Sequence, residues 1–233
     1  GMNNYFFKPD HAFQLRDTIL SQFSSISRRT VTTAPSSSST LPKTALPSFN
    51  VLFINRKERR ELQRHQVILD GLRSHFRENK ANLTGVQQQP PTVIYINDFG
   101  ALDVWGQIKL MSEHDIIIAP HGNSLSTIGF ASECTSILEV YPHKLAIPGY
   151  FLPLAINAGL QAFGLHDGAN ISDTQVQLEG TGIPGRSAVR DASIDKPWEI
   201  LAMVPTMMES RRRCCQNLVD QKEWKRAANS RCL

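Results

Sequence analysis

The sequence lacks the long apolar runs of membrane-spanning helices and the residue pattern of a secretory signal peptide. No stretch approaches the roughly 18 consecutive apolar residues that a spanning helix needs. The N-terminus lacks the order of basic and then apolar residues that marks a secretory signal. We therefore expect no signal and no membrane span within this chain, and a membrane anchor upstream of Gly1 stays open.

Cysteine is scarce, and its spacing does not suit a metal. The four cysteines include no Cys-x-x-Cys and no cysteine–histidine ligand spacing, so we expect no zinc site and leave the redox compartment open. The adjacent Cys214 and Cys215 could bond to Cys232, bond to each other under strain, or stay unpaired. Glycosylation triplets at Asn82 and Asn170 suit a secretory-pathway lumen, so the predicted location is the Golgi or the endoplasmic reticulum lumen.

Neither sign of charge dominates. A formal net charge of +4 with 20% charged residues suits anionic ligands such as phosphates, but it does not predict a nucleic-acid surface. No aromatic residues interleave with the basic tail that contains residues 211–213. Nucleic acid is therefore not an expected partner.

The chain divides into segments of different composition. Its 233 residues suffice for one core domain with appendages. Residues 1–23 contain apolar residues at near-helical spacing and are predicted to be a helix remaining from an upstream region. Residues 24–48 are mostly Ser, Thr and Pro and are predicted to be a linker. Residues 49–165 are predicted to be an α/β domain, and residues 166–233 a loop-rich segment followed by a C-terminal helix.

Short apolar runs alternate with helix-compatible segments in the middle of the chain. Strands are predicted at residues 50–55, 92–97, 116–119 and 136–140, and helices around residues 67–76, 103–112, 124–130 and 150–159. This alternation predicts a Rossmann-like parallel sheet with flanking helices. Ligands of such sheets bind at the carboxyl ends of the strands, so polar residues there are the candidates for a site.

Arg56 stands just past the first predicted strand. A guanidinium there can donate two hydrogen bonds to a phosphate, and a diphosphate would suit it. The alternative is that residues 56–64 form a solvated, charged turn and helix face.

His121 and Gly122 follow the third predicted strand. A glycine there lets the backbone approach a ligand closely, and a helix opening at Asn123 or Ser124 would direct its free amides at an anion. His121 could then bind a phosphate or a sugar hydroxyl, or it could be a structural histidine held by a carbonyl.

Glu139 lies inside the apolar fourth strand. Burial of an unpaired carboxylate is costly, so something must satisfy this group. A ribose diol is one candidate, and the alternatives are a salt bridge to Arg or Lys or exposure at the strand end.

These motifs, taken in order, resemble glycosyltransferase family 61, which includes protein O-linked N-acetylglucosaminyltransferases and plant β-xylosyltransferases. The likeness covers roughly residues 50–165 and rests on Phe53-Ile54-Asn55-Arg56 with Arg59-Arg60, on Phe99 and Gln107, on Pro120-His121-Gly122-Asn123-Ser124-Leu125, on Phe130 and on Leu138-Glu139-Val140-Tyr141-Pro142.

The resemblance implies the C-terminal, donor-binding lobe of a GT-B glycosyltransferase. The expected partners are a nucleotide sugar, with UDP as the nucleotide, and a protein or glycan acceptor. Arg56 would bind the diphosphate, Glu139 would meet the ribose, and the remaining donor-site residues would be Gln107, His121, Gly122, Asn123 and Ser124. Transfer would be inverting, without cofactor or obligatory metal, and the sequence contains no Asp-x-Asp. The general base is not identified, and Glu113, Asp115 and His121 are weak candidates.

The chain also departs from the family pattern. Asn123 and Ser124 replace a small residue and a glycine, Gly106 stands where Glu usually precedes Gln107, and an acceptor-binding N-terminal half is largely absent, as in a fragment. The alternative function is therefore a noncatalytic lobe that binds a nucleotide sugar or docks a partner through residues 211–224. A hydrolase that uses His121 lacks a Gly-x-Ser-x-Gly elbow.

Overall fold

A single parallel sheet organises the molecule. The structure is a computed structural model that describes residues 14–19, 21, 49–57, 60–81, 92–142, 145–146, 149–166, 175–176, 194–223 and 232. The strands are β1 (Val51–Ile54), β2 (Val93–Ile96), β3 (Ile116–Pro120), β4 (Ser136–Val140) and β6 (Gln161–Leu165). Their order is β2-β1-β3-β4-β6 and every neighbouring pair is parallel, which confirms the predicted Rossmann-like α/β fold.

The strand order reverses between β1 and β3. From β1 the chain moves outward to β2, and then crosses back to β3 before it continues through β4 to β6. Loops leaving the sheet on either side of such a reversal diverge and open a crevice at the carboxyl ends of the strands. The loop after β1 and the loop after β3 flank this crevice, so Arg56 and His121 both lie at the carboxyl ends of the strands.

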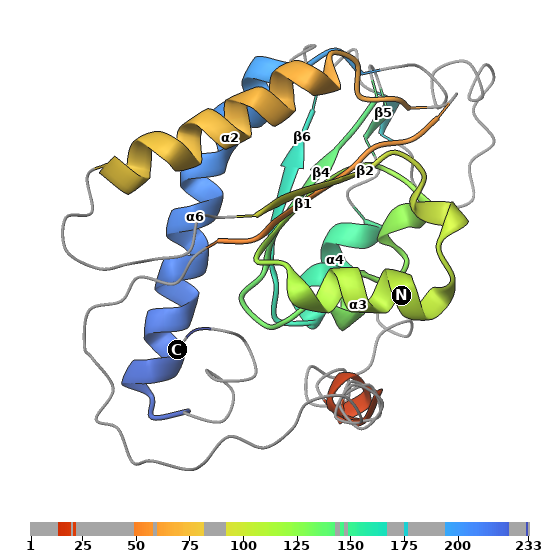
Figure 1. Cartoon of the computed structure of the whole chain (residues 1–233). Helices are drawn as coiled ribbons and strands as arrows, with labels where there is room; N and C mark the ends of the chain where they lie inside the picture. Colours follow the sequence, from red (N-terminus) through yellow and green to blue (C-terminus); the bar gives the residue numbers. More distant parts are fainter. Residues whose placement is uncertain are drawn as a thin grey trace, which may run out of the picture.

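Helices cover both faces of the sheet (Figure 1). The helices α2 (His65–Ala81) and α6 (Pro197–Asp220) lie on one face. The other face carries α3 (Val104–Glu113), α4 (Phe151–Asn157) and the short 3-10 turns η2 (Phe99–Ala101), η3 (Asn123–Leu125) and η4 (Ile128–Phe130). A separate parallel pair joins β5 (Leu145–Ala146) to β7 (Gln175–Val176).

The central strands are apolar because both of their faces are buried. In β1, Val51 and Phe53 pack into the core beneath α2 and α6, whereas Leu52 and Ile54 pack into the core beneath α3 and α4. Alternate side chains of a strand point to opposite faces, so a sheet covered on both sides needs continuous apolar runs. The same alternation places His121 and Glu139 toward the α4 side, where His121 contacts Phe151.

The C-terminal helix packs as part of the α/β unit. Ile200, Val204 and Met207 of α6 share one core with residues of β1, β3 and β4. Disulfides join Cys134 to Cys214 and Cys215 to Cys232. The second bond is one of the alternatives that the sequence left open, and the first links α6 to the loop before β4.

Some predicted elements differ from the structure. The helix expected at residues 124–130 is replaced by η3 and η4, and β6 was not predicted because its sequence, Gln-Ala-Phe-Gly-Leu, has no β-branched residue. Residues 14–19 are helical, and Arg16 Nη1 donates to the Ala131 carbonyl at 3.2 Å. The predicted linker at residues 24–48 and the glycosylation triplets lie outside the described residues. Within the part that is described, no helix is both long and apolar enough to span a membrane.

Candidate functional site

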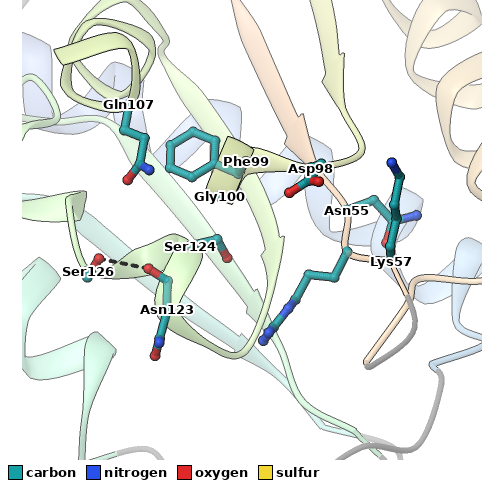
Figure 2. A pocket seen from close by; sticks show the side chains of 10 residues that line it. Asn55, Lys57, Asp98, Phe99, Gly100, Gln107, Asn123, Ser124 and Ser126 are labelled. Carbon is teal, nitrogen blue, oxygen red and sulfur yellow. Dashed lines mark hydrogen bonds between the residues drawn. The ribbon is translucent and has the colours of Figure 1, made fainter. Parts of the chain in front are cut away.

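A cavity of about 490 Å³ lies at the point where the strand order reverses. In Figure 2, Asn123, Ser124 and Ser126 lie on one side of the hollow, and Asn55 and Lys57 lie on the other. All of the segments that line it follow the carboxyl ends of β1, β2 and β3 or belong to α3. The lining residues are Asn55, Arg56, Lys57, Asp98, Phe99, Gly100, Gln107, Asn123, Ser124 and Ser126.

Two guanidinium groups converge beside this cavity. Arg60 Nη1 donates to the His121 carbonyl at 2.6 Å, and Arg56 Nη1 lies 3.4 Å from the same oxygen. Two guanidinium groups thus meet at the carboxyl ends of β1 and β3, which is where ligands of such sheets usually bind.

Gly122 makes this convergence possible. Its φ is +148°, a conformation that side-chain-bearing residues rarely adopt, and a Cβ at this position would collide with Arg56 and press against Arg60. Glycine thus removes both a backbone penalty and a steric block. The predicted close approach of this backbone to a ligand stays a prediction; in the structure the groups close to Gly122 are the two arginines.

Asn55 fixes the loop that carries the arginines. Its side-chain oxygen accepts from the Leu62 amide at 2.7 Å, and its side-chain nitrogen donates to the Leu62 carbonyl at 3.2 Å. These two bonds tie the end of β1 to Leu62. Asn55 was predicted only as part of the motif, and a buried asparagine directly after an apolar strand is the signal that could have shown its role.

Polar groups from the opposite wall complete the cavity. The Ser124 hydroxyl oxygen is buried and has no hydrogen-bond partner among the described residues. Gln107 Nε2 donates to the Leu102 carbonyl at 3.0 Å, and Asp103 caps α3 by accepting from the Gly106 amide at 2.6 Å. A buried hydroxyl without a partner is costly, so Ser124 favours a polar ligand in this cavity.

His121 and Glu139 form a hydrogen-bonded cluster with Tyr141. His121 Nδ1 lies 2.5 Å from Glu139 Oε1, and the Tyr141 hydroxyl donates to Glu139 Oε2 at 2.8 Å. Burial, followed by the charge of Glu139, raises the pKa of Tyr141 well above its ordinary value, so the phenol stays neutral and acts as the donor.

The partners of Glu139 differ from those that the sequence suggested. Neither a salt bridge to Arg or Lys nor exposure at the strand end accounts for this carboxylate, because it is fully buried and both of its oxygens are bound. Direct contact with a ribose would require Glu139 to exchange these partners. The ribose role therefore stays a prediction from the resemblance, and Glu139 sits behind His121.

Glu113 and Asp115 lie at the amino end of β3, opposite the end of the sheet that carries the cavity. Both precede β3, whose five residues separate them from its carboxyl end by about 16 Å at roughly 3.3 Å per residue. Asp115 is buried and accepts from Arg211 Nη2 at 2.6 Å and from the Asn50 amide at 2.8 Å. Asp115 holds α6 to the sheet and Glu113 is exposed, and their candidacy as general bases stays a prediction.

Several residues of the site were not predicted as ligand contacts. Lys57, Asp98, Gly100 and Ser126 line the cavity, and Arg60 shares the His121 carbonyl with the lining residue Arg56. Asp98 follows the end of β2, so the rule that ligands meet the carboxyl ends of strands could have found it. Arg60 is four residues beyond Arg56 in a charged run. Its contact with the His121 carbonyl depends on a backbone φ of +54° at Arg60, which the sequence does not predict.

Replacing Gly122 with alanine tests the close approach. We expect the free energy of unfolding to fall by about 1–3 kcal/mol, because a Cβ cannot adopt this backbone conformation without strain. Urea denaturation followed by circular dichroism measures the change. Gly149→Ala is the matched control, since this residue is exposed and a Cβ added to it would meet nothing within 4 Å. Equal stability of the two variants would contradict the steric argument.

The fold and the cavity define a class: a parallel α/β protein with a polar cavity at its topological switch point. A family model described as Glycosyltransferase 61 matches residues 8–138, more than half of the chain. The chain therefore belongs to glycosyltransferase family 61, as its motifs suggested, and glycosyltransferase activity is what this membership implies. A comparison with curated proteins gives no match.

Proposed function

We propose that this chain is the donor-binding lobe of a glycosyltransferase that uses a nucleotide sugar, with UDP as the nucleotide, and transfers the sugar to a hydroxyl of a protein or glycan. The observation that carries the proposal is the convergence of Arg56 and Arg60 on the His121 carbonyl beside the cavity. Planar guanidinium groups match the oxygens of phosphates and carboxylates geometrically. A diphosphate supplies enough oxygens and charge for both arginines.

The other lining residues suit the remaining parts of such a donor. The unpartnered Ser124 hydroxyl can donate to a phosphate oxygen, and Asp98 and Gln107 offer oxygens to sugar or ribose hydroxyls. Lys57 adds a further cation to the wall. The cavity of about 490 Å³ falls within the roughly 300–1,000 Å³ range of small-molecule sites.

The proposed reaction is an inverting displacement at the anomeric carbon. The acceptor oxygen forms a bond to this carbon while the bond from the carbon to the diphosphate oxygen breaks, and the hydroxyl proton passes to a base. Arg56 and Arg60 would stabilise the negative charge that develops on the leaving diphosphate, which is the step where fixed cations lower a barrier most. No obligatory metal is proposed.

Ligand-induced thermal stabilisation tests the donor. UDP, UDP-GlcNAc or UDP-xylose at about 100 times its Kd should stabilise the folded chain by about 2.7 kcal/mol, which corresponds to a rise in Tm of roughly 5–10 °C. Arg56→Ala should weaken UDP binding by roughly 10-fold to 150-fold, the equivalent of a hydrogen bond to a charged group. Differential scanning fluorimetry and calorimetric titration measure both effects.

Two controls sharpen this prediction. Arg73→Ala, which removes an exposed arginine of α2, should leave the UDP affinity unchanged. UMP lacks the second phosphate, so Arg56→Ala should reduce the affinity difference between UDP and UMP. An unchanged Tm with all the nucleotides would contradict nucleotide binding. Transfer of the sugar to water or to a peptide or xylan acceptor, with release of UDP, separates an enzyme from a noncatalytic lobe.

The proposed location is the lumen of the endoplasmic reticulum or Golgi. Two disulfides among the described residues support it, because such bonds persist in oxidising compartments and are rare in the cytosol. The proposed acceptors, proteins and glycans, are available there.

A further inference from the structure

The cavity at the strand reversal is lined by polar groups that differ in what they can do with a proton. Amides and hydroxyls do not take up a proton near neutral pH, and guanidinium and ammonium groups already carry one. Apart from one carboxylate, the described lining residues are of these kinds or are Phe99 and Gly100. The carboxylate is that of Asp98. Among the described residues that line the cavity, Asp98 is therefore the one that can accept a proton from a substrate.

The Asp98 carboxylate is not used to hold the backbone. Aspartate is one of the residues that most often cap a helix, and Asp98 stands at the capping position of η2, but its side chain makes no capping hydrogen bond. In the same connection between β2 and α3, Asp103 does cap its helix, by accepting from the Gly106 amide at 2.6 Å. Asp98 is also exposed. Its carboxylate is thus accessible to solvent and to a substrate in the cavity.

The alignment of two strands sets Asp98 and Arg56 at matching positions. Ile54 and Ile96 are paired as the last residues of β1 and β2, so Arg56 and Asp98 are each the second residue beyond this pair. Both residues line the cavity. The Arg56 guanidinium, however, extends toward β3, where its Nη1 lies 3.4 Å from the carbonyl oxygen of His121, the residue that follows this strand.

The cavity therefore has a cation toward one end and a carboxylate toward the other. The strand order is β2-β1-β3, so Asp98 and the His121 carbonyl are separated by two strand spacings, about 9–10 Å at roughly 4.8 Å each. In Figure 2, Asp98 lies toward Asn55 and away from Asn123. A displacement needs a row of atoms in which acceptor oxygen and anomeric carbon are about 3–3.5 Å apart, with a hydrogen bond of about 2.7–2.9 Å at each end. Two strand spacings leave room for that row.

We propose that Asp98 is the general base that removes the proton from the acceptor hydroxyl. This assignment deepens the proposed function and rests on it. The acceptor oxygen forms its bond to the anomeric carbon while its O–H bond breaks and the proton passes to a carboxylate oxygen of Asp98. The bond from the anomeric carbon to the diphosphate oxygen breaks, and its electron pair leaves with the diphosphate beside Arg56. Because Asp98 is exposed, it can then release the proton to water.

The other candidates for the base are placed less favourably. Glu113 and Asp115 precede β3, so they lie at the opposite end of this strand from the cavity. The His121 imidazole is bound to Glu139, and His121 is not among the described residues that line the cavity. All three candidacies stay predictions, which the assay for Asp98 can compare.

Asp98→Asn keeps the shape of the side chain but cannot accept a proton. With UDP-GlcNAc or UDP-xylose as donor and water, a peptide or xylan as acceptor, we expect kcat for UDP release to fall by about 10²-fold to 10⁴-fold, the usual contribution of a general base. The donor Kd from calorimetric titration should stay within roughly twofold of the parent value, because the base acts on the acceptor. Asp70→Asn, at an exposed position on α2, is the control that should match the parent chain in both measurements.

Chemical rescue separates a catalytic base from a structural carboxylate. Asp98→Ala removes the carboxylate and leaves space for a small one, so added formate should raise the rate of UDP release by this variant about tenfold or more. Formate should not accelerate Asp98→Asn, because the amide fills that space. A structural role would instead lower the free energy of unfolding in both variants, with no response to formate.

The outcomes distinguish this assignment from the proposed function. If neither UDP-sugar binds the parent chain, the donor assignment and the base fall together. If they bind and the parent chain releases no UDP, or if Asp98→Asn keeps the parent kcat, the donor site stands and Asp98 is not the base. A variant Asp98→Asn that keeps kcat but binds the donor about tenfold more weakly would show that this carboxylate binds a donor hydroxyl, and it would overturn the base alone.

Discussion

Asp115→Ala should lower the free energy of unfolding by about 3–5 kcal/mol, the usual cost of removing one partner of a buried ion pair. Asp115 and Arg211 are each only 2% exposed, and their charged atoms lie 2.6 Å apart. Without the carboxylate, the Arg211 guanidinium would remain buried between α6 and the sheet with its main countercharge removed. The Asn50 amide would also lose the oxygen that accepts its proton. Urea denaturation of the parent chain and the variant measures the difference.

A compensating variant distinguishes ion pairing from simple packing. In Asp115→Asn combined with Arg211→Met, the amide oxygen still accepts from Asn50 and both charges of this pair are removed, so most of the lost stability should return. Arg213→Met is the matched control on the same helix. Its side chain is 77% exposed and pairs with Glu209, so its loss should change stability by less than about 1 kcal/mol. A control as damaging as Asp115→Ala would contradict the ion-pair argument.

Variants at Asp115 also test its candidacy as a general base. Because this residue lies at the amino end of β3 and the cavity lies beyond the carboxyl end, the folded fraction of Asp115→Asn should bind UDP with the parent affinity. A loss of sugar transfer greater than the loss of folded protein would support Asp115 as the general base. Stability and function are therefore separable at this position.

The sheet was predictable because its strands are buried on both faces. The apolar runs of β1, β3 and β4 admit few other interpretations once helix-compatible segments are seen between them. Residues 161–165 carry no such run, since β6 is an edge strand whose side chains are half-buried or exposed, so local composition gives little signal. The segment at residues 124–130 has helical spacing, but it is divided into two short turns, η3 and η4.

The candidate site was predictable in position more than in contacts. Arg56, Gln107, Asn123 and Ser124 all line the cavity, because the rule on strand ends depends only on where strands stop. The pairing of Glu139 with His121 depends on the alignment of β3 with β4, which sets Ala119 beside Glu139 and brings the next residues within reach. The sequence of neither strand predicts how the two strands align. The closeness of Arg60 likewise depends on the loop that Asn55 closes.

The disulfides were the least predictable feature, and removing one of them should have an effect as large as that of the ion pair. Cys134→Ala with Cys214→Ala opens a link between residues 80 apart in sequence. Loop-closure entropy assigns such a link about 4.5 kcal/mol of stability, and the link between Cys215 and Cys232, 17 residues apart, about 3 kcal/mol. Alanine is the suitable replacement for buried Cys134, because a serine hydroxyl would need a hydrogen-bond partner there.

The order of the two effects is the sharper part of this expectation. If restriction of the unfolded chain dominates, the double variant at Cys134 and Cys214 should lose more stability in urea than the double variant at Cys215 and Cys232. A reductant breaks both disulfides of the parent chain, so neither variant should then be less stable than the parent chain. A reversed order would mean that packing around α6 outweighs chain entropy. Thiol titration of the unfolded chain tests whether both disulfides form. Four free thiols in protein from an oxidising compartment would contradict the disulfides, and the support that they give to a lumenal location would be lost.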